Sequence, residues 1–212
     1  MAESLALVIG DKQFSSWSLR PWLLLKEFGI PFREERIRLR QPDTGAQIAK
    51  HGTGATVPIL KDGDVAVWES LAIAEYLAER FADKVMWPRD RAARAFARTI
   101  CAEMHAGFQA LRSECSMNIL ARVTPFVPVM GVKRDVARVE LLWAEARGRS
   151  SKGGKFLFGD FSIADAFYAP VATRFRTYGI KLTPESQAYC DNIFALEGMR
   201  EWERGAREEA SD

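Results

Sequence analysis

Short apolar runs alternate with amphipathic stretches over the first eighty residues. Apolar runs and alternating patterns predict four strands, over Leu5 to Ile9, Phe32 to Leu39, Val57 to Leu60 and Val65 to Trp68. The tripeptide Asp62-Gly63-Asp64 is typical of a β-hairpin turn and joins the last two strands. Helical spacing predicts helices over Trp17 to Phe28, Leu71 to Phe81 and, more briefly, around Ala46 to Lys50. This order predicts an α/β sheet with an antiparallel end.

From about Asp90 onward the chain carries only helical patterns. They predict helices over Arg91 to Leu120, Lys133 to Arg147, Ile163 to Tyr178 and Glu185 to Arg207. Two segments without periodicity interrupt this order, Asp83 to Arg89 and Ser150 to Lys155. We therefore expect a small α/β domain over residues 1–82 and an all-helical domain over residues 90–212.

Composition and charge narrow the class of protein. The chain of 212 residues has a formal net charge of only +2, and its arginine-rich stretches also contain glutamates, which indicates solvated faces and not a nucleic-acid footprint. Three widely spaced cysteines fit reduced thiols and give no zinc spacing. No basic leader precedes the first strand, and no apolar run approaches the roughly 20 residues that span a bilayer. We expect a soluble, cytoplasmic protein that binds no nucleic acid, membrane or metal.

Three serines, Ser15, Ser16 and Ser18, stand where the first strand gives way to the first helix. A helix N-terminus exposes unpaired N–H groups and the positive end of the helix dipole, so it favours an anion. Serine is also a favoured helix cap. The local sequence leaves both interpretations open.

Two further motifs could extend such an anion site. A cis Val57–Pro58 bond would turn the backbone N–H and C=O of Val57 outward to pair with an extended peptide, although a trans proline at a sheet edge is more frequent. Ser70 stands at the start of the next helix beside Glu69, so the two could bind the carboxylate and ammonium of an α-amino acid head group. For Ser70 the alternative is a plain N-cap. The spacing of Ser162 and Asp165 predicts a structural capping box.

Together these motifs resemble the cytosolic glutathione S-transferases, over nearly the whole chain. The motifs that carry the resemblance are Ser15-Ser16-Trp17-Ser18, Val57-Pro58, Glu69-Ser70 and the capping box. The serine cluster is most similar to the zeta class, whose pattern reads Ser-Ser-Cys-Ser-Trp-Arg, with Trp17 in place of the cysteine and Leu19 in place of the tryptophan. The resemblance implies a thioredoxin-like N-terminal domain, an all-helical C-terminal domain and a homodimer.

The resemblance also implies that the anion is the thiolate of glutathione, the co-substrate. A hydroxyl that donates to a thiolate lowers the pKa of the thiol. Ser15 matches the catalytic serine, with Ser16 as the alternative. The other glutathione-binding residues that it implies are Lys50, His51, Thr56, Val57, Pro58, Glu69 and Ser70. The pocket for the electrophile would be lined by Met104, His105, Phe108 and Arg112, with Met117 and Asn118 in the same region.

The activity expected from the resemblance is the addition of glutathione to a small electrophile, as in detoxification. One alternative is a glutathione-dependent isomerase of the maleylacetoacetate or maleylpyruvate type, against which the loss of the cysteine at Trp17 argues. Another is a non-catalytic binding or scaffold protein of the same fold. The absence of a cysteine near residues 13–18 argues against thiol–disulfide exchange. Arg112, Arg174 and Arg176 could contact an acidic substrate or simply lie on exposed helix faces.

Overall fold

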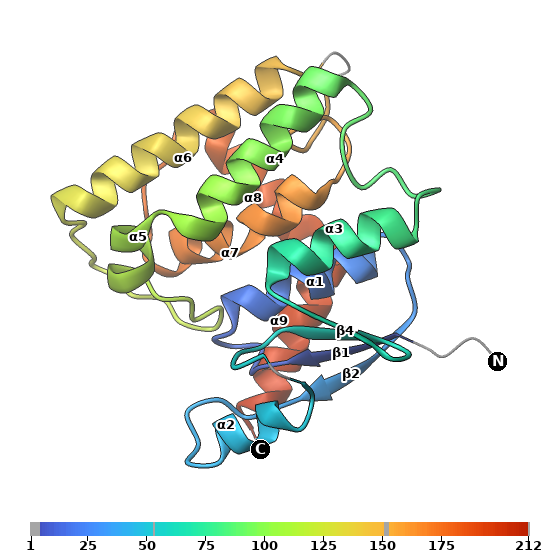
Figure 1. Ribbon diagram of the computed structural model, residues 1–212. Helices are drawn as coiled ribbons and strands as arrows, with labels where there is room; N and C mark the ends of the chain where they lie inside the picture. Colours follow the sequence, from blue (N-terminus) through green and yellow to red (C-terminus); the bar gives the residue numbers. More distant parts are fainter. Residues whose placement is uncertain (1–4, 53, 151–152, 212) are drawn as a thin grey trace.

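The chain forms a four-stranded sheet with three helices and then a purely helical bundle (Figure 1). The computed structural model describes residues 5–52, 54–150 and 153–211. Its strands are β1 (Leu5–Ile9), β2 (Phe32–Arg36), β3 (Ile59–Asp62) and β4 (Val65–Trp68). Its helices are α1 (Ser16–Glu27), α2 (Thr44–Ala49), α3 (Ser70–Arg80), α4 (Arg91–Ala106), α5 (Gln109–Glu114), α6 (Met130–Gly148), α7 (Ile163–Thr177), α8 (Pro184–Ala195) and α9 (Glu197–Glu209). The predicted order of strands and helices in the first eighty residues is confirmed.

The strands lie in the order β2-β1-β3-β4. β1 pairs in parallel with β2, with Leu5 opposite Phe32, whereas β3 is antiparallel to both β1 and β4. β1 is buried along its whole length, as expected for a central strand covered on both faces. The sheet is therefore mixed, with the predicted antiparallel end.

Two predicted strands differ from the observed ones in their bounds: β2 is shorter, and β3 is shifted by two residues to Ile59–Asp62. β2 ends at Arg36 and not at Leu39, because its partner β1 ends at Ile9. β3 begins at Ile59 and not at Val57, because the proline at position 58 has no N–H to donate to the ladder. The end of β2 thus follows from its partner strand and the start of β3 from the proline.

Two helical predictions are wrong in their length. The predicted helix from Arg91 to Leu120 ends at Ala106, since Gly107 is extended and Phe108 adopts a left-handed conformation (φ 60°) before the short helix α5. The predicted helix from Glu185 to Arg207 is broken at Leu196, whose ψ of 138° separates α8 from α9. The predicted helices at α6 and α7 are confirmed, with α6 beginning three residues earlier, at Met130.

The sheet part and the helical part share one hydrophobic core. α1 packs against α3, α7 and α9, and Figure 1 shows α9 running from the bundle back across the sheet part. The core is continuous from Leu7 on β1 through Leu23 on α1 to Phe167 on α7. Ser15 at the start of α1 therefore lies where the two parts meet.

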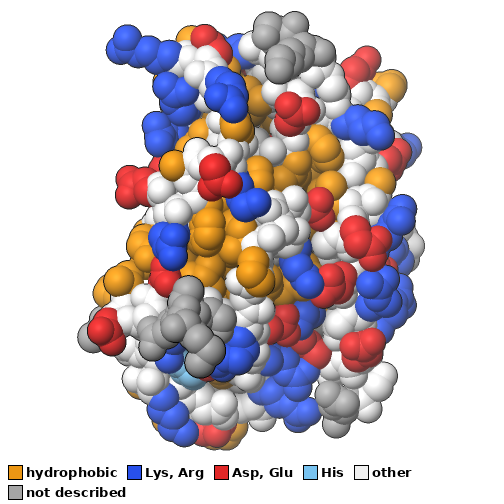
Figure 2. Space-filling view, turned by 90° about the vertical axis from the view of Figure 1, so that its right-hand side faces the viewer, with side chains coloured by type: hydrophobic (Ala, Val, Ile, Leu, Met, Phe, Trp, Pro, Cys, Tyr) orange, Lys and Arg blue, Asp and Glu red, His pale blue; other side chains and the backbone are white. Residues whose placement is uncertain are grey.

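The aperiodic segment 83–89 connects the two parts and is held by both. Trp87 donates from its indole nitrogen to Glu75 on α3 (3.2 Å), and Met86 accepts the backbone N–H of Ile163 at the start of α7 (3.0 Å). Figure 2 shows hydrophobic side chains gathered among charged ones on the face that carries this connection. The second predicted break includes Ser151 and Lys152, which lie outside the described residues.

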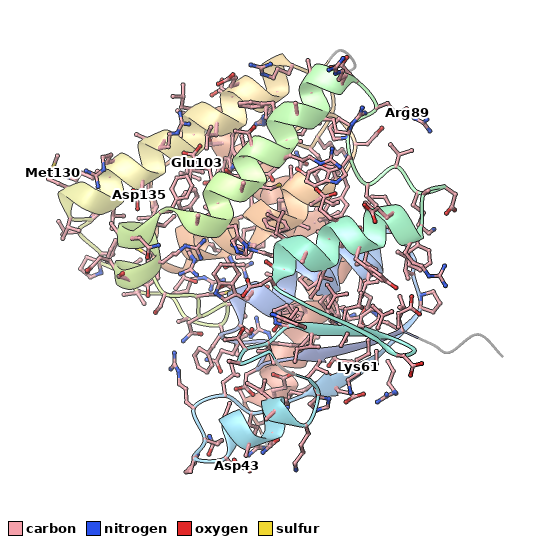
Figure 3. All side chains as sticks on the ribbon, viewed as in Figure 1. Asp43, Lys61, Arg89, Glu103, Met130 and Asp135 are labelled. Atoms are coloured by element: carbon pink, nitrogen blue, oxygen red, sulfur yellow. The ribbon has the colours of Figure 1, made fainter. Side chains whose placement is uncertain are left out.

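Across the bundle, α4 and α6 run side by side and are joined by polar contacts (Figure 3). Arg138 binds both carboxylate oxygens of Glu103 (2.7 and 2.9 Å), and Asp135 accepts the backbone N–H of Leu111 at the start of α5 (3.0 Å). None of the described helices is long and apolar enough to cross a membrane.

Candidate functional site

Ser15 is the N-cap of α1. β1 ends at Ile9, and a turn closed by the backbone N–H of Ser15 on the carbonyl of Asp11 (2.9 Å) leads into the helix. The Ser15 side chain accepts the backbone N–H of Ser18 (3.3 Å). The capping interpretation of this serine is therefore confirmed, and it places a hydroxyl at the positive end of the helix dipole.

The Ser15 hydroxyl also belongs to a buried chain of hydrogen bonds. Its oxygen lies 2.7 Å from the hydroxyl oxygen of Ser18, which accepts the backbone N–H of Gly10 at 3.1 Å. Ser18 is fully buried and Ser15 is 5% exposed.

Ser16, the next residue along, is held by the helical part of the molecule. Its hydroxyl accepts a hydrogen bond from the guanidinium of Arg174 on α7 (3.2 Å), which also donates to the carbonyl of Cys115 (2.5 Å). Burial, and secondarily the charge of Arg112, lower the pKa of Arg174 to about 10. The two tandem serines thus differ in their surroundings, since Ser15 bonds within its own helix and Ser16 bonds across to α7.

Trp17 occupies the centre of a cluster of cations. The guanidinium carbon of Arg20 lies 4.2 Å from its ring centroid and that of Arg112 lies 4.8 Å away. The ring of His105 packs edge-on at 5.1 Å. Arg20 also lies over the ring of Phe167 (4.7 Å), so two aromatic faces stabilise its buried charge.

Arg20, Arg112 and Arg174 are cations without acidic partners. In the described part of the chain none of the three forms an ion pair; their hydrogen bonds go to carbonyls and to the hydroxyls of Ser16 and Ser70. Burial, followed by the charge of Arg112, lowers the pKa of Arg20 to about 9, and burial also lowers the pKa of Arg112. The cluster formed by these three arginines, called the arginine cluster below, favours an anion at the junction of the two parts.

The second predicted motif has the geometry that would expose the backbone of residue 57. The Val57–Pro58 bond is cis, and both side chains are buried. Thr56, before it, is exposed. Of the two alternatives that the sequence left open, the cis bond is confirmed.

The third motif, Glu69-Ser70, contacts the arginine cluster through Arg20. Ser70 is buried at the start of α3, where its hydroxyl accepts from the guanidinium of Arg20 (3.2 Å). Glu69 precedes it with a positive φ of 68°, a conformation that non-glycine residues seldom adopt and that turns its backbone sharply. Its carboxylate lies 3.4 Å from Nε2 of His105 on α4. Glu69 and Ser70 are therefore brought next to the serine cluster through Arg20 and His105.

The surroundings of His105 favour its neutral form. Burial, and next the charge of Arg20, lower its pKa, while the carboxylate of Glu69 acts in the opposite direction. Its Nδ1 is buried without a hydrogen-bond partner among the described residues.

The remaining predicted residues lie in the hydrophobic core, beside the turn before α1, or just after α2. Met104, Phe108 and Met117 are buried in the hydrophobic core, whereas Asn118 accepts from the side chain of Gln13 (3.0 Å) in the turn before α1. Lys50 and His51 follow α2; Lys50 is exposed, and His51 lies 3.4 Å from a carboxylate oxygen of Glu35. Burial, followed by the charge of Lys61, lowers the pKa of His51. Among the described residues, no hydrogen bond or ion pair joins Lys50 or His51 to the serine cluster.

The sequence indicated no role for Arg20 or Ser18 beyond their place in the motif. Both lie within five residues of Ser15 and are fully buried, which is unusual for polar side chains. No group of three or more potential metal ligands occurs in the described residues.

Comparisons with known proteins agree with this fold. A family profile described as "Glutathione S-transferase, N-terminal domain" matches residues 14–80. A probable maleylacetoacetate isomerase of Caenorhabditis elegans is 29% identical over 171 residues, which cover 80% of this chain and 78% of that protein.

Solved structures with low sequence identity share the fold over almost their whole length. A glutathione transferase homologue from Burkholderia, solved with bound glutathione, superimposes with a TM-score of 0.74 at 22% identity, covering 97% of this chain and 100% of that one. A maleyl pyruvate isomerase, described as a bacterial glutathione S-transferase of the zeta class, has a TM-score of 0.71 at 19% identity, covering 93% and 95%.

Proposed function

Since this chain belongs to the glutathione S-transferase family, by its N-terminal domain and by its fold, we propose that it binds glutathione and activates the thiolate through the hydroxyl of Ser15. The thiolate then adds to a small electrophile. The observation that carries this proposal is the position of the Ser15 hydroxyl, which caps α1 at the junction of the two parts of the molecule.

The peptide part of glutathione would be held by the other two motifs. The cis bond before Pro58 supports an antiparallel pairing between the backbone of Val57 and the cysteinyl unit of glutathione. Glu69 would accept from the γ-glutamyl ammonium, while Ser70 and the start of α3 would bind the carboxylate beside it. Lys50 and His51 are the candidates for binding the glycine carboxylate, and Thr56 is a further proposed contact of glutathione.

The chemistry follows from the acidity of the thiol. A thiol is nucleophilic only as the thiolate, and its pKa lies near 8.5 in water. A hydrogen bond to a charged group contributes about 1.5–3 kcal/mol, and about 1.4 kcal/mol corresponds to one pKa unit, so one hydroxyl donor can lower the pKa by about one to two units. Ser15 donates and does not itself become a nucleophile. The remote contacts hold the thiolate in position for attack.

Ser15→Ala and Ser16→Ala, compared with the parent protein, test this assignment. We expect Ser15→Ala to raise the pKa of bound glutathione by about one to two units and to lower kcat/KM for an aryl halide by about 10- to 100-fold. The thiolate is measured by its ultraviolet absorbance, and glutathione binding by calorimetry. Unchanged turnover in Ser15→Ala would remove this serine from the mechanism, and no binding of glutathione by the parent would favour the scaffold alternative.

The arginine cluster supports a second candidate, an isomerase that acts on an acidic substrate. Arg20, Arg112 and Arg174 lie near Ser16 and Trp17 and have no acidic partner in the part of the chain that the structure describes, so a carboxylate-bearing electrophile would find an unbalanced positive charge there. Reversible addition of a thiolate to a maleyl double bond leaves a single bond that can rotate before the thiolate departs. Glutathione is then regenerated and acts as a catalyst.

A pair of electrophiles that differ only by a carboxylate tests this candidate. We expect Arg112→Met to raise KM for the charged electrophile by about tenfold or more and to leave KM for its neutral ester within about twofold. Arg138→Met is the matched control, because that arginine binds Glu103 on an outer face of the bundle. Equal effects on both electrophiles would count against an anionic substrate.

The same family membership supports three broader proposals. We infer a homodimer, a cytoplasmic location and a role in detoxification. The boundaries at residues 82 and 90 belong to this proposal, as does an electrophile pocket near Met104, His105, Phe108 and Arg112.

A further inference from the structure

Ser18 is a fully buried hydroxyl that touches the proposed catalytic serine. Its oxygen accepts the backbone N–H of Gly10 (3.1 Å) and lies 2.7 Å from the oxygen of Ser15. These are its side-chain hydrogen bonds among the described residues.

The proton of the Ser18 hydroxyl has one acceptor available. If Ser15 donated to Ser18, the Ser18 oxygen would accept twice, from Ser15 and from Gly10, and its own proton would be buried without an acceptor. A buried, unsatisfied donor is strongly unfavourable. In the opposite direction, Ser18 donates to Ser15, and the proton left without an acceptor is that of Ser15, which is 5% exposed and can reach water or an incoming anion, whereas Ser18 is fully buried.

We propose that Ser18 is a positioning residue that donates its proton to Ser15 and so directs the Ser15 proton away from the helix, toward the glutathione thiolate. This inference rests on the proposed function of Ser15. The Ser15 oxygen then accepts two hydrogen bonds, from the backbone N–H and the hydroxyl of Ser18, and its own proton remains free for an anion.

This series of hydrogen-bond donors also strengthens the hydrogen bond from Ser15 to the thiolate. In the proposed direction, the N–H of Gly10 donates to Ser18 (3.1 Å), Ser18 donates to Ser15 across the 2.7 Å between their oxygens, and Ser15 donates to the thiolate. In such a chain each bond polarises the next and strengthens it by roughly 10–30%. Ser18 therefore acts on the thiolate through Ser15 without touching glutathione.

The sign of the change in Ser18→Ala tests the direction of the bond. We expect the pKa of bound glutathione to rise by several tenths of a unit, less than in Ser15→Ala, because Ser15 loses a polarising donor. If Ser15 instead donated to Ser18 in the parent, the variant would release the Ser15 proton and the pKa of bound glutathione would fall. A fall, or no change, would overturn the proposal.

The chain contains a matched control for loss of a buried hydroxyl at a helix cap. Thr183 caps α8, and its oxygen lies 3.0 Å from the hydroxyl of Ser186, three residues on, as Ser15 lies beside Ser18. Ser186→Ala should change thermal stability and leave the pKa of bound glutathione unchanged. An equal rise in both variants would mean that the effect comes from lost stability, and the proposal would fail.

A second pair of variants keeps the test decisive if Ser18→Ala folds poorly. Ser18→Thr and Ser18→Val have nearly the same shape, and only Thr keeps the hydroxyl. We expect a lower pKa of bound glutathione in Ser18→Thr than in Ser18→Val; equal values would overturn the proposal. If Ser15→Ala itself leaves this pKa unchanged, the proposed function fails; if only the Ser18 variants deviate from expectation, the role of Ser18 alone fails.

Discussion

Trp17 lets Arg20 and Arg112 lie close together although neither has an acidic partner among the described residues. Its ring contacts the guanidinium groups of Arg20 and Arg112 and the edge of His105. The negative face of an indole ring stabilises a nearby cation by about 0.5–2 kcal/mol without neutralising its charge. The arginine cluster therefore keeps its positive charge for an incoming anion, which a carboxylate in the place of Trp17 would cancel.

The contact between His105 and Glu69 can be observed directly, because the chain contains only two histidines. Removing the Glu69 carboxylate removes an interaction that raises the pKa of His105, while burial and the charge of Arg20 continue to lower it. We expect the pKa of His105 to fall further in Glu69→Gln, so that less of this histidine is protonated at any given mildly acidic pH. Proton NMR titration of the imidazole signals, assigned with His51→Gln, measures the change.

The control for this titration is Glu79→Gln, a substitution on the same helix α3. It should leave the pKa of His105 unaltered. An unaltered pKa in Glu69→Gln as well would show that the two side chains are not neighbours in solution.

The positions of Ser15 and Ser70 at helix starts were predictable from the sequence, but the partners of the candidate residues were not. The sequence predicted Ser15, Ser70 and residue 57 from local rules for helix starts and proline, which depend on a few adjacent residues. Arg174 binds Ser16 from 158 positions away, and no local pattern indicates that contact. Such long-range pairings arise from the packing of α7 on α1.

At the scale of elements, periodicity predicted which segments are helical but not where two helices end. The apolar pattern continues through Phe108, although its backbone is left-handed there. The side chain of Arg112 donates to the carbonyl of Gly107 (2.8 Å), a contact that helps to end α4. Hydrophobic spacing reports the buried face of a segment, and that face can continue across a break in the helix.

The capping box of α7 is the local motif on which the bundle depends most. Asp165 is fully buried and accepts four hydrogen bonds, from the backbone N–H groups of Leu157 and Ser162 and from the hydroxyls of Ser162 and Tyr189. Asp165→Ala leaves these donors unpaired, and we expect the free energy of unfolding to fall by at least about 3 kcal/mol. Urea unfolding measures the loss.

Tyr189→Phe is the control for that loss, because it removes one of the four bonds. We expect this variant to lose about 1 kcal/mol. A loss below about 1 kcal/mol in Asp165→Ala would contradict a structural role for the motif.

At the scale of the whole molecule, α9 fastens the helical part to the sheet part. The indole N–H of Trp202 donates to the carbonyl of Lys12 (2.8 Å), and its ring packs edge-on against Trp22 of α1 (5.0 Å). Lys12 precedes the serine cluster by three residues, so α9 supports the turn that presents Ser15. The sequence predicted a helix here and could not place it, since its partners lie almost 200 residues away.

The strength of this attachment is measurable as the coupling between Lys12 and Glu209. The Lys12 ammonium is nearly buried, lies 3.1 Å from one oxygen of Glu209 and also pairs with Glu34, while its backbone N–H donates to the other oxygen of Glu209 (2.7 Å). Lys12→Met, Glu209→Gln and the double variant form a double-mutant cycle in the free energy of unfolding. We expect a coupling energy of about 1–3 kcal/mol, because little water screens the pair.

The control is an exposed ion pair on α6, formed by Arg149 and Glu145, for which the same cycle should give about 0.5 kcal/mol or less. If the Lys12 cycle gave no more than that exposed pair, the ion pair would not hold α9 in place, and the packing of Trp202 on Trp22 would have to do so alone.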